Sequence, residues 1–273
     1  MMKLRRIALL LGLSATASGL QVTVAGGSGF VGSRVCKYLV ENGAEVTSVS
    51  KSGKVPDWAA RESWSSQVKW VANEMTRGDM EGLVTAVGTP EAFVSCVGSV
   101  GFDRQGLLVG NGKANVDICK ALTKVGTVQR ISYVSASEEL FDLKSVWTYL
   151  GFFLGYFDGK RLAEAAFNEL APGRTTIVRP TFIYGGDSFG IAPPRVTAEY
   201  GAGVEKLLSG PPFKQVAGLM PGLIKIALRP PVSVDAVAAA AARAALGKIE
   251  PGDLQGEAIG KAADLPVPAP LEA

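Results

Sequence analysis

Seven residues near the amino end, Gly26 to Gly32, constrain the fold of this chain more than any other segment. They have the sequence GGSGFVG, follow an apolar run over residues 21–25 and open a segment of helical periodicity over residues 29–42. Glycine at Gly26, Gly29 and Gly32 suits a tight turn, a close approach of the backbone to a pyrophosphate, and close packing of a helix on a strand. The sequence therefore predicts a dinucleotide-binding turn, with a glycine turn that binds no ligand as the alternative.

The position of this loop matters more than its spacing. Glycine supplies 33 of the 273 residues, so three glycines at fixed spacing are weak support by themselves. Their place between a predicted strand and a predicted helix is what favours a phosphate site, because the amides at a helix N-terminus face bound phosphates. We expect the cofactor to contact the whole loop, which comprises Gly26, Ser28, Gly29, Phe30, Val31 and Gly32.

The rest of the chain alternates apolar runs with segments of helical period, which is typical of βαβ units and a parallel sheet. Strands are predicted over residues 21–25, 45–49, 68–71, 92–97, 130–135 and 175–178, and helices over residues 29–42, 80–87, 111–125, 156–170 and 234–246. The predicted fold class is α/β, a doubly wound parallel sheet with a small C-terminal cap on the substrate side. The predicted organisation is a targeting segment over residues 1–19, a nucleotide-binding core over residues 20–184, and the cap, a final packing helix and a tail over residues 185–273.

The first 19 residues are basic and contain a short apolar run, Ile7 to Leu13, followed by small residues. This pattern is typical of a targeting segment and predicts an organellar protein, in the mitochondrion by slight preference or in the plastid. The alternative is an uncleaved arm that docks on the domain or on a membrane surface. A bilayer span takes about 20 apolar residues, so no transmembrane span is predicted.

The absence of histidine from the chain excludes several classes of function. A Ser-His-Asp hydrolase, a Cys-His protease and a His-ligated zinc site cannot be built from this chain alone, and we predict no metal site. The 28 basic and 25 acidic residues give a net charge of +3, and Lys3, Arg5 and Arg6 account for that excess. The remainder is formally neutral, so we expect no nucleic acid as a partner.

The residues after the second predicted strand indicate which dinucleotide binds. A fold that selects NAD usually has an acidic residue there to hold the ribose hydroxyls. This chain has Ser50, Lys51 and Ser52 instead, a cation flanked by two hydroxyl groups. These side chains suit a 2′-phosphate and favour NADP(H) over NAD(H). The alternative is an ordinary solvated loop lysine.

Tyr156 and Lys160 are four residues apart on a predicted helix that follows the fifth predicted strand. Residues at this spacing share one helix face, so both side chains would face one ligand. A neighbouring ammonium favours the tyrosinate and makes the phenol a useful acid or base, and the same lysine can bind the nicotinamide ribose. The pair is therefore predicted to be catalytic, with a surface pair as the alternative.

Four segments together resemble an atypical, extended short-chain dehydrogenase/reductase. They are GGSGFVG, YVSAS after the fifth strand, YFDGK at the catalytic helix and VRPTFIYG after the sixth strand. SCVGSVG, GYFDGKRLAEAAF and RPPVSVDAVAAAA are similar to an organellar branch of this superfamily. That branch includes the nucleotide-binding accessory subunit of respiratory complex I and coenzyme Q biosynthesis proteins.

The resemblance implies roles for individual residues. Tyr156 would be the acid/base, Lys160 its partner and a ribose ligand, and Asn115 a supporting residue of the site. The segment after the fourth strand, with Cys96, Val97 and Gly98, would contact the cofactor. Arg179 and Pro180 would lie near the cofactor at the sheet edge, with Pro180 in contact with it.

Two positions depart from the family pattern. Catalytic relatives have a Ser or Thr that bonds the substrate carbonyl, and an ungapped match puts Ala136 at this position, between Ser135 and Ser137. A shift of one residue would bring a serine into the site, and Ser135, at the strand end, is the first choice. Asn73-Glu74 also replaces the usual Gly-Asp after the third strand, which alters the expected contacts on the adenine side.

An apolar stretch from Val146 to Gly155 precedes the catalytic helix, and a second runs from Leu219 to Leu228. Core packing is the default explanation. The alternative is a hydrophobic mouth for a quinone-like or prenylated substrate, or a patch for peripheral contact with a membrane or a partner complex.

Three functions are therefore weighed. The first is an NADPH-dependent oxidoreductase that acts on, or supports synthesis of, a hydrophobic quinone or lipid in an organelle. The second is a non-catalytic, nucleotide-binding accessory subunit or assembly factor of an organellar membrane complex, which Ala136 favours. A sugar-nucleotide epimerase or dehydratase ranks last, because the apolar loop gives it no support.

Overall fold

Seven parallel strands form the central sheet of the protein in a computed structural model, which describes residues 19–101, 103–142, 155–186, 190–191, 194–195, 197–210 and 229–264. The strands are β1 Gln21–Ala25, β2 Glu45–Ser50, β3 Val68–Ala72, β4 Ala92–Ser95, β5 Arg130–Val134, β6 Thr175–Arg179 and β11 Gly252–Gln255. Their order is β11-β6-β5-β4-β1-β2-β3, which reverses direction beside β1 as in dinucleotide-binding sheets. The prediction of an α/β, doubly wound parallel sheet is confirmed.

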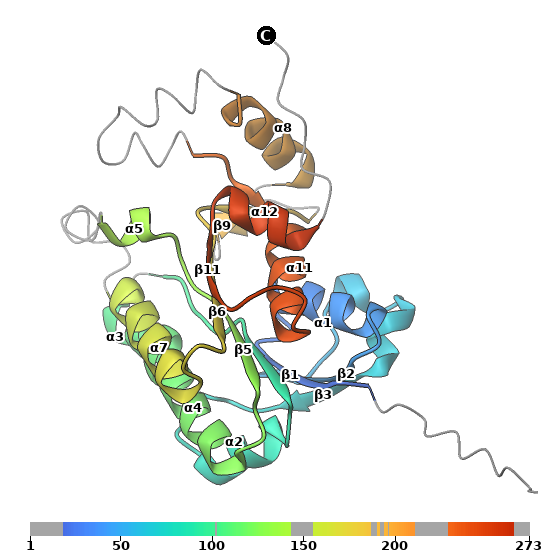
Figure 1. Cartoon of the computed structure of the whole chain (residues 1–273), viewed down its shortest axis with the longest axis vertical. Helices are drawn as coiled ribbons and strands as arrows, with labels where there is room; N and C mark the ends of the chain where they lie inside the picture. Colours follow the sequence, from blue (N-terminus) through green and yellow to red (C-terminus); the bar gives the residue numbers. More distant parts are fainter. Residues whose placement is uncertain are drawn as a thin grey trace, which may run out of the picture.

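Helices cover both faces of this sheet (Figure 1). One face carries α2 Met80–Val87, α4 Ala114–Val125 and α7 Tyr156–Leu170, and the other carries α1 Gly32–Glu41, α11 Val234–Ala245 and α12 Glu257–Ala263. The middle strands are therefore buried on both sides; residues 22–25 of β1, for example, are all buried. Continuous apolar runs of this kind are expected in a covered parallel sheet.

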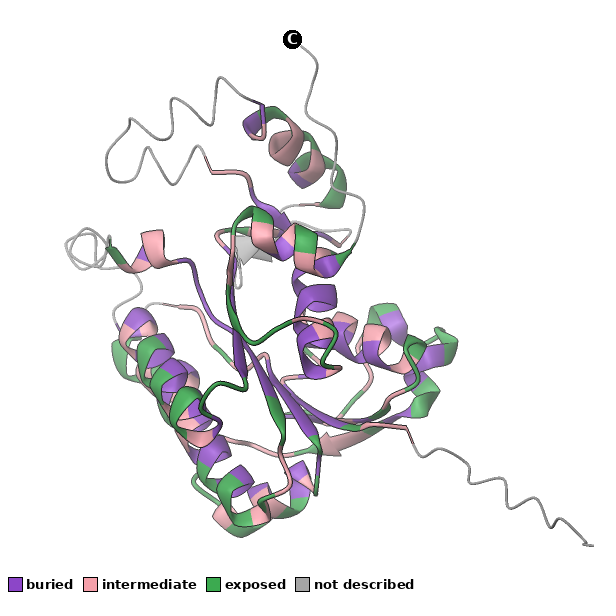
Figure 2. Ribbon diagram, in the orientation of Figure 1, coloured by how far each residue is buried: buried purple, intermediate pink, exposed green. Residues whose placement is uncertain are grey.

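Helix α11 packs directly on the sheet and on α1. Its run Ala238–Ala242 is fully buried, and Figure 2 shows the helix as almost wholly buried. Alanine side chains are short, so the helix axis can lie close to its neighbours without leaving voids. Ser233 accepts a hydrogen bond from the amide of Ala236 (3.1 Å) and so caps the helix at its start.

Shorter elements surround the carboxyl edge of the sheet. They are α3 Arg104–Leu108, a π turn Val109–Lys113, α5 Glu138–Asp142 and α8 Ala198–Leu208, with the strands β7 Ile183–Tyr184, β8 Gly190–Ile191, β9 Pro194–Arg195 and β10 Val232–Ser233. Two 3-10 turns, Asp57–Ala59 and Ser63–Gln67, lie between β2 and β3, and the second leads into the amino end of β3. Figure 1 shows α8 set apart from the sheet, beyond α12. Within the described ranges, no helix is long and apolar enough to cross a membrane.

Candidate dinucleotide and catalytic site

The glycine loop forms a tight turn at the carboxyl end of β1. Gly26 has a φ of +79°, and the amide of Gly29 donates to the carbonyl of Gly26 at 2.9 Å. A Cβ at Gly32 would lie 2.2 Å from that same carbonyl oxygen, so no side chain fits there. The loop therefore requires glycine at the turn and at the point where α1 meets it.

The start of α1 suits a pyrophosphate. Its N-cap residue, Val31, supplies no side-chain hydrogen bond to the first helical amides. Helix N-terminal amides with no side-chain cap, next to a close backbone turn, are the donors that bind phosphate oxygens. The ring of Phe30 lies 4.9 Å from the guanidinium of Arg34, beside the loop. The residues present thus fit a dinucleotide at this edge.

The hydroxyl groups of Ser28 and Ser50 are used inside the protein. Their Oγ atoms lie 2.8 Å apart, and the Ser28 hydroxyl also bonds the carbonyl of Lys54 at 2.5 Å. Ser50 Oγ accepts from the amide of Gly53 at 3.1 Å, and Ser52 Oγ accepts from the amide of Lys54 at 3.3 Å. These bonds shape the turn after β2 beside the glycine loop.

Lys51 forms an ion pair with Glu74, which follows β3. Its Nζ lies 2.9 Å from Glu74 Oε2, and 82% of the lysine side chain is exposed. Thr76 donates to the other carboxylate oxygen at 2.8 Å. Bonds from Lys51 and Thr76 lower the pKa of Glu74, so its carboxylate is charged at neutral pH. A phosphate that approaches Lys51 would therefore meet an anion already bound to it.

Tyr156 and Lys160 lie on the first turns of α7, close to the end of β5. Lys160 Nζ donates to the carbonyl of Val134 at 2.9 Å and lies 5.8 Å from the centre of the Tyr156 ring. Burial raises the pKa of Tyr156 to about 12 and lowers the pKa of Lys160 to about 8. The structure thus brings together the two residues that the spacing pairs. The expected lowering of the tyrosine pKa by the ammonium is not found, because burial raises this pKa and the phenol is protonated at neutral pH.

Ser135 and Ala136 occupy different surroundings. The Ser135 hydroxyl donates to Glu164 Oε1 at 2.5 Å and is buried with it. Ala136 is buried in a cluster with Leu140 and Phe157, and Tyr156 packs against this cluster. The structure therefore brings alanine rather than Ser135 to the side of the tyrosine. A direct role for Ser135 in catalysis stays a prediction, and it would require the bond to Glu164 to break.

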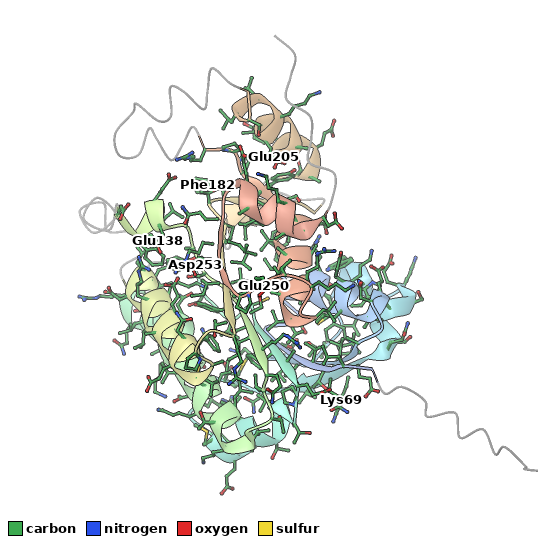
Figure 3. All side chains as sticks on the ribbon, in the orientation of Figure 1. Lys69, Glu138, Phe182, Glu205, Glu250 and Asp253 are labelled. Atoms are coloured by element: carbon green, nitrogen blue, oxygen red, sulfur yellow. The ribbon has the colours of Figure 1, made fainter. Side chains whose placement is uncertain are left out.

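Arg179 lies at the centre of an ionic network at the ends of β5, β6 and β11, in which Arg179 and Glu164 are buried and the side chains of the other members are at least 40% exposed. Its Nη2 is 3.2 Å from both Glu164 Oε2 and Asp253 Oδ2, and its Nη1 bonds Glu138. Arg161 bonds both Glu138 and Glu164. Figure 3 shows Glu138 and Asp253 in this region, between α7 and β11. The network ties α5, the element after Ala136, to the sheet.

Pro180 follows Arg179 at the same edge, and its carbonyl accepts from the amide of Ser137 at 3.0 Å. This bond continues the β5–β6 pairing beyond the end of the sheet. Contact between Pro180 and a cofactor remains a prediction.

The segment after β4 lies between the glycine loop and Lys160. A Cβ at Gly26 would lie 3.0 Å from the Cys96 backbone, and a Cβ at Gly98 would lie 3.2 Å from Lys160 Nζ. Asn115 is fully buried, accepts from Ser95 Oγ at 2.6 Å and donates to the carbonyl of Val97 at 3.3 Å. Asn115 therefore holds the segment after β4 in place from its buried side.

Asn111 lies closer to the lysine and was missed in the sequence. Its Oδ1 accepts from the amide of Ser99 (3.2 Å) and would lie 2.8 Å from a Cβ at Gly98. It belongs to the π turn that precedes α4, and π turns inside helices are frequent at functional sites. The signal was Gly110 and Gly112 on either side of this asparagine, because glycines interrupt a helix.

Glycine also sets how close this turn lies to the catalytic helix. A Cβ at Gly112 would lie 2.9 Å from the Cα of Gly159 on α7. The two backbones therefore touch directly between Asn111 and Lys160, which fixes the distance between these elements.

Several predicted features lie outside the described residues. They are residues 1–18 of the predicted targeting segment, residues 146–154 of the first apolar stretch and the second stretch, residues 219–228. A groove of about 710 Å³ is lined by residues such as Gln21, Glu45 and Lys69. It lies at the amino ends of β1, β2 and β3, at the edge of the sheet opposite to the candidate site.

Comparisons with known proteins agree with this geometry. Residues 22–145 match the model of the NAD dependent epimerase/dehydratase family. The enzyme WbmG of Bordetella bronchiseptica, solved in complex with NAD, superimposes with a TM-score of 0.56 at 15% identity and covers 96% of this chain and 83% of its own. The predicted resemblance to the short-chain dehydrogenase/reductase superfamily is confirmed.

Two sequence relatives are more similar. A chloroplastic protein of Arabidopsis thaliana is 35% identical over 167 residues, which are 60% of this chain and 51% of that protein. MIOREX complex component 2 of Saccharomyces cerevisiae is 38% identical over 61 residues, which are 22% of each chain. The chain thus spans at most about half the length of the curated relatives it matches.

Proposed function

Because residues 22–145 match the NAD dependent epimerase/dehydratase family, we propose that this chain is an NADP(H)-binding oxidoreductase of the short-chain dehydrogenase type. The observation that carries the proposal is the Tyr156–Lys160 pair at the start of α7, in which Tyr156 is partly buried and Lys160 is buried beside the segment that leads to the glycine loop. In this proposal the pair faces the reacting end of the cofactor, and the glycine loop holds the other end.

The chain's own residues supply the acid and its setting. Tyr156 keeps its proton at neutral pH, because burial raises its pKa to about 12, and donates it to the alkoxide that forms on the substrate. The Lys160 ammonium stabilises the tyrosinate left behind. Gly98 allows a ligand to approach Lys160 Nζ, since any side chain there would fill that space. A bound nicotinamide would supply the hydride.

Lys51 supports the choice of NADP(H). Its ammonium is exposed at the end of β2, where a 2′-phosphate would lie, and no acidic residue occupies positions 50–52. Its pairing with Glu74 weakens the preference without removing it, because an exposed ion pair of this kind contributes only about 0.2–1 kcal/mol. The phosphate carries more charge than the carboxylate it would replace.

A hydrophobic substrate in an organelle is the second part of the proposal. Phe182 follows the Arg179-Pro180 pair and is 49% exposed near the carboxyl edge of the sheet. An exposed aromatic ring at the carboxyl edge of the sheet favours an apolar ligand such as a quinone or a lipid. The chloroplastic name of the Arabidopsis relative supports an organelle, and the mitochondrion and the plastid both remain candidates.

A second candidate function is a non-catalytic, nucleotide-binding subunit or assembly factor. The surroundings of Ala136 favour it, because Tyr156 packs on a cluster that contains alanine where a catalytic serine would lie. Ser135 is bonded to Glu164 instead. A protein of this kind would keep the cofactor for stability and use its surfaces for docking.

Calorimetric titration of the full chain with NADPH and with NADH tests the shared premise. The oxidoreductase proposal predicts micromolar NADPH binding and clearly weaker NADH binding. Failure of both to bind at millimolar concentration would refute both candidate functions.

Tyr156→Phe separates the two candidates. In an enzyme, this change lowers kcat for NADPH-dependent reduction of a short-chain quinone by about 100-fold or more, and NADPH affinity is retained. Glu41→Gln, at the far end of α1, serves as the control and should retain both kcat and NADPH affinity. NADPH binding with no turnover in either the natural chain or the control would favour the accessory subunit.

A further inference from the structure

The Lys160 ammonium is enclosed by aromatic rings. The side chain is 5% exposed, and its Nζ lies 4.9 Å from the centre of the Tyr133 ring and 5.8 Å from that of Tyr156. One hydrogen bond, to the carbonyl of Val134, measures 2.9 Å. A buried ammonium with so few oxygen partners needs another source of stabilisation.

The central sheet fixes the position of the Tyr133 ring beside the Lys160 ammonium. It lies on β5 directly before Val134, so the strand that offers its carbonyl to Lys160 also fixes the ring. The residue is fully buried and its ring packs against Phe167 at 5.0 Å, which prevents it from turning away. Its hydroxyl is buried with no hydrogen-bond partner among the described residues. The ring, rather than the hydroxyl, therefore makes the contact that matters.

Each element around Lys160 contributes a polar or charged group. On α7 these are Tyr156 and Glu164, on the segment after β4 Cys96, and on the π turn Asn111. Glu164 is already bonded to Arg179, Arg161 and Ser135, so its charge is largely compensated.

The thiol of Cys96 does not supply a charge either. Burial raises the pKa of Cys96 to about 12, which keeps the thiol neutral. Among the described residues, the negative potential that remains beside the ammonium therefore comes from the Val134 carbonyl and from the two ring faces, of which that of Tyr133 is the nearer.

We propose that Tyr133 is a positioning residue, whose ring keeps Lys160 protonated and directed at Tyr156 by a buried cation–π contact. The role deepens the proposed oxidoreductase function, since it acts through the lysine of that site. A cation is stabilised over the face of a desolvated aromatic ring, so removing the ring should make Lys160 lose its proton at a lower pH.

The test follows the titration of Lys160 directly. The full chain is labelled with 13C and 15N in lysine, and the Lys160 side-chain resonance is assigned from its loss in Lys160→Arg. Tyr133→Leu removes the ring, and we expect the titration midpoint to fall by about one pH unit. Tyr133→Phe keeps the ring and should keep the midpoint close to that of the natural chain.

A matched control separates the contact from a general effect on the core. Phe93→Leu removes another fully buried ring of the same cluster, which packs on Phe167 at 6.4 Å. An unchanged midpoint in Tyr133→Leu, or an equal fall in Phe93→Leu, would overturn the proposal. Where Tyr133→Leu does not fold, trifluorophenylalanine at this position weakens the ring's potential at nearly constant shape and must lower the midpoint.

The measurement needs no cofactor and no substrate. If Lys160 titrates as expected and NADPH does not bind, the contact with Tyr133 stands and the oxidoreductase proposal fails. If NADPH binds and turnover occurs while the midpoint is the same in all Tyr133 variants, the oxidoreductase proposal stands and the proposed role of Tyr133 fails.

Discussion

The two halves of the carboxyl edge are built on different principles. On the glycine-loop side, the geometry is fixed by backbone: the Gly26 turn and the contact of Gly32 with it leave no space for a side chain. On the α7 side, the contact of Gly112 with Gly159 sets the distance of the helix from the π turn, but the functional groups are held by buried polar side chains, with Lys160 bonded to Val134 and Glu164 to Ser135.

This difference determines how each half can change. A backbone turn is kept or lost as a whole. Adding a single methyl group at Gly32, for example, would bring it against the carbonyl oxygen of Gly26. A side-chain site can lose one member, as at Ala136, while Tyr156 and Lys160 keep their places. The nucleotide half keeps its glycine turn and departs from the family pattern at Asn73-Glu74, whereas the catalytic half has Ala136 where that pattern has a hydroxyl group.

The largest effect should come from Gly32→Ala. The new Cβ would lie 2.2 Å from the Gly26 carbonyl oxygen, so the turn or the helix must shift. We expect a free energy of unfolding lower by about 3 kcal/mol and NADPH binding weakened at least about 100-fold, which is 2.7 kcal/mol or more. Urea denaturation and calorimetry measure both.

The control is Gly203→Ala on α8, where an added Cβ would meet nothing within 4 Å. There the unfolding free energy should rise slightly, because alanine favours a helix by about 1 kcal/mol over glycine. Native affinity in Gly32→Ala would contradict the view that backbone geometry determines this half.

The next largest effect concerns the buried ammonium of Lys160 on the α7 side. Burial lowers the pKa of Lys160 to about 8, from an ordinary value near 10.4. Between these two pH values the unfolded chain binds more protons than the folded one, so the unfolding free energy of the natural chain rises with pH. Lys160→Met has no ionisable group at this position, so it lacks this rise of the unfolding free energy with pH. The stability difference between the two proteins should therefore move by about 3 kcal/mol in favour of the natural chain between pH 7 and pH 10.5.

Denaturant unfolding of both proteins at a series of pH values checks this expectation. Lys120→Met, on the exposed face of α4, is the control, and its difference from the natural chain should show no comparable rise. A constant difference for Lys160→Met would mean that the ammonium is solvated in the folded protein.

The same contrast explains what the sequence could predict. Strands β1, β2, β3, β5 and β6 begin and end within one residue of their predicted bounds, because long apolar runs between turn residues are a strong local signal. Strand β11 was missed because it lies at the sheet edge with a half-exposed pattern, GDLQ, that has no apolar run. Helix α12 has only seven residues, too few for a helical period to show.

In the site, residues that act through backbone or helix spacing were predictable, and those that depend on tertiary contacts were not. The place of the glycines between a predicted strand and a predicted helix predicted the loop, and the four-residue spacing predicted that Tyr156 and Lys160 lie together. Whether Ser135 or Ala136 lies beside Tyr156 depends on how the chain turns after β5, because Ser135 contacts α7 at Glu164 and Ala136 packs near its first turn. The buried partner Glu164 that takes the Ser135 hydroxyl lies 29 residues away in sequence.

A smaller effect should come from restoring the missing hydroxyl. Ala136→Ser places a donor beside Tyr156, where the substrate carbonyl would develop charge. If the chain is an enzyme, quinone reduction by NADPH should rise by up to about 100-fold, which is the lower limit of what one such donor contributes. Stopped-flow absorbance of NADPH measures this rate.

Ala171→Ser, a buried alanine at the opposite end of α7, controls for the cost of burying a hydroxyl. No gain in Ala136→Ser, with NADPH bound and the fold intact, would favour the accessory-subunit function. The comparison between the two halves would then sharpen: the nucleotide half would be functional and the catalytic half inactive.

The smallest effect is expected at the adenine end of the proposed cofactor site, where Glu74 and Lys51 form an ion pair. Glu74 binds Lys51 at 2.9 Å, and its lowered pKa keeps it ionised at neutral pH. A 2′-phosphate must compete with this carboxylate for the ammonium and is repelled by it. Glu74→Gln keeps the shape and removes the charge, so NADPH affinity should rise up to about fivefold, which is 1 kcal/mol for an exposed pair.

NADH carries no 2′-phosphate, so its affinity should not change in Glu74→Gln. The control is Glu41→Gln, which breaks a comparable pair with Lys37 (3.9 Å) at the other end of α1 and should alter neither affinity. The rise should shrink at high salt, because exposed charges are screened. An equal rise for NADPH and NADH would show that Glu74 acts on the adenine rather than on the phosphate. Lys51 would then not be the residue that selects NADP(H), and the preference would have to come from the backbone of the glycine-loop half.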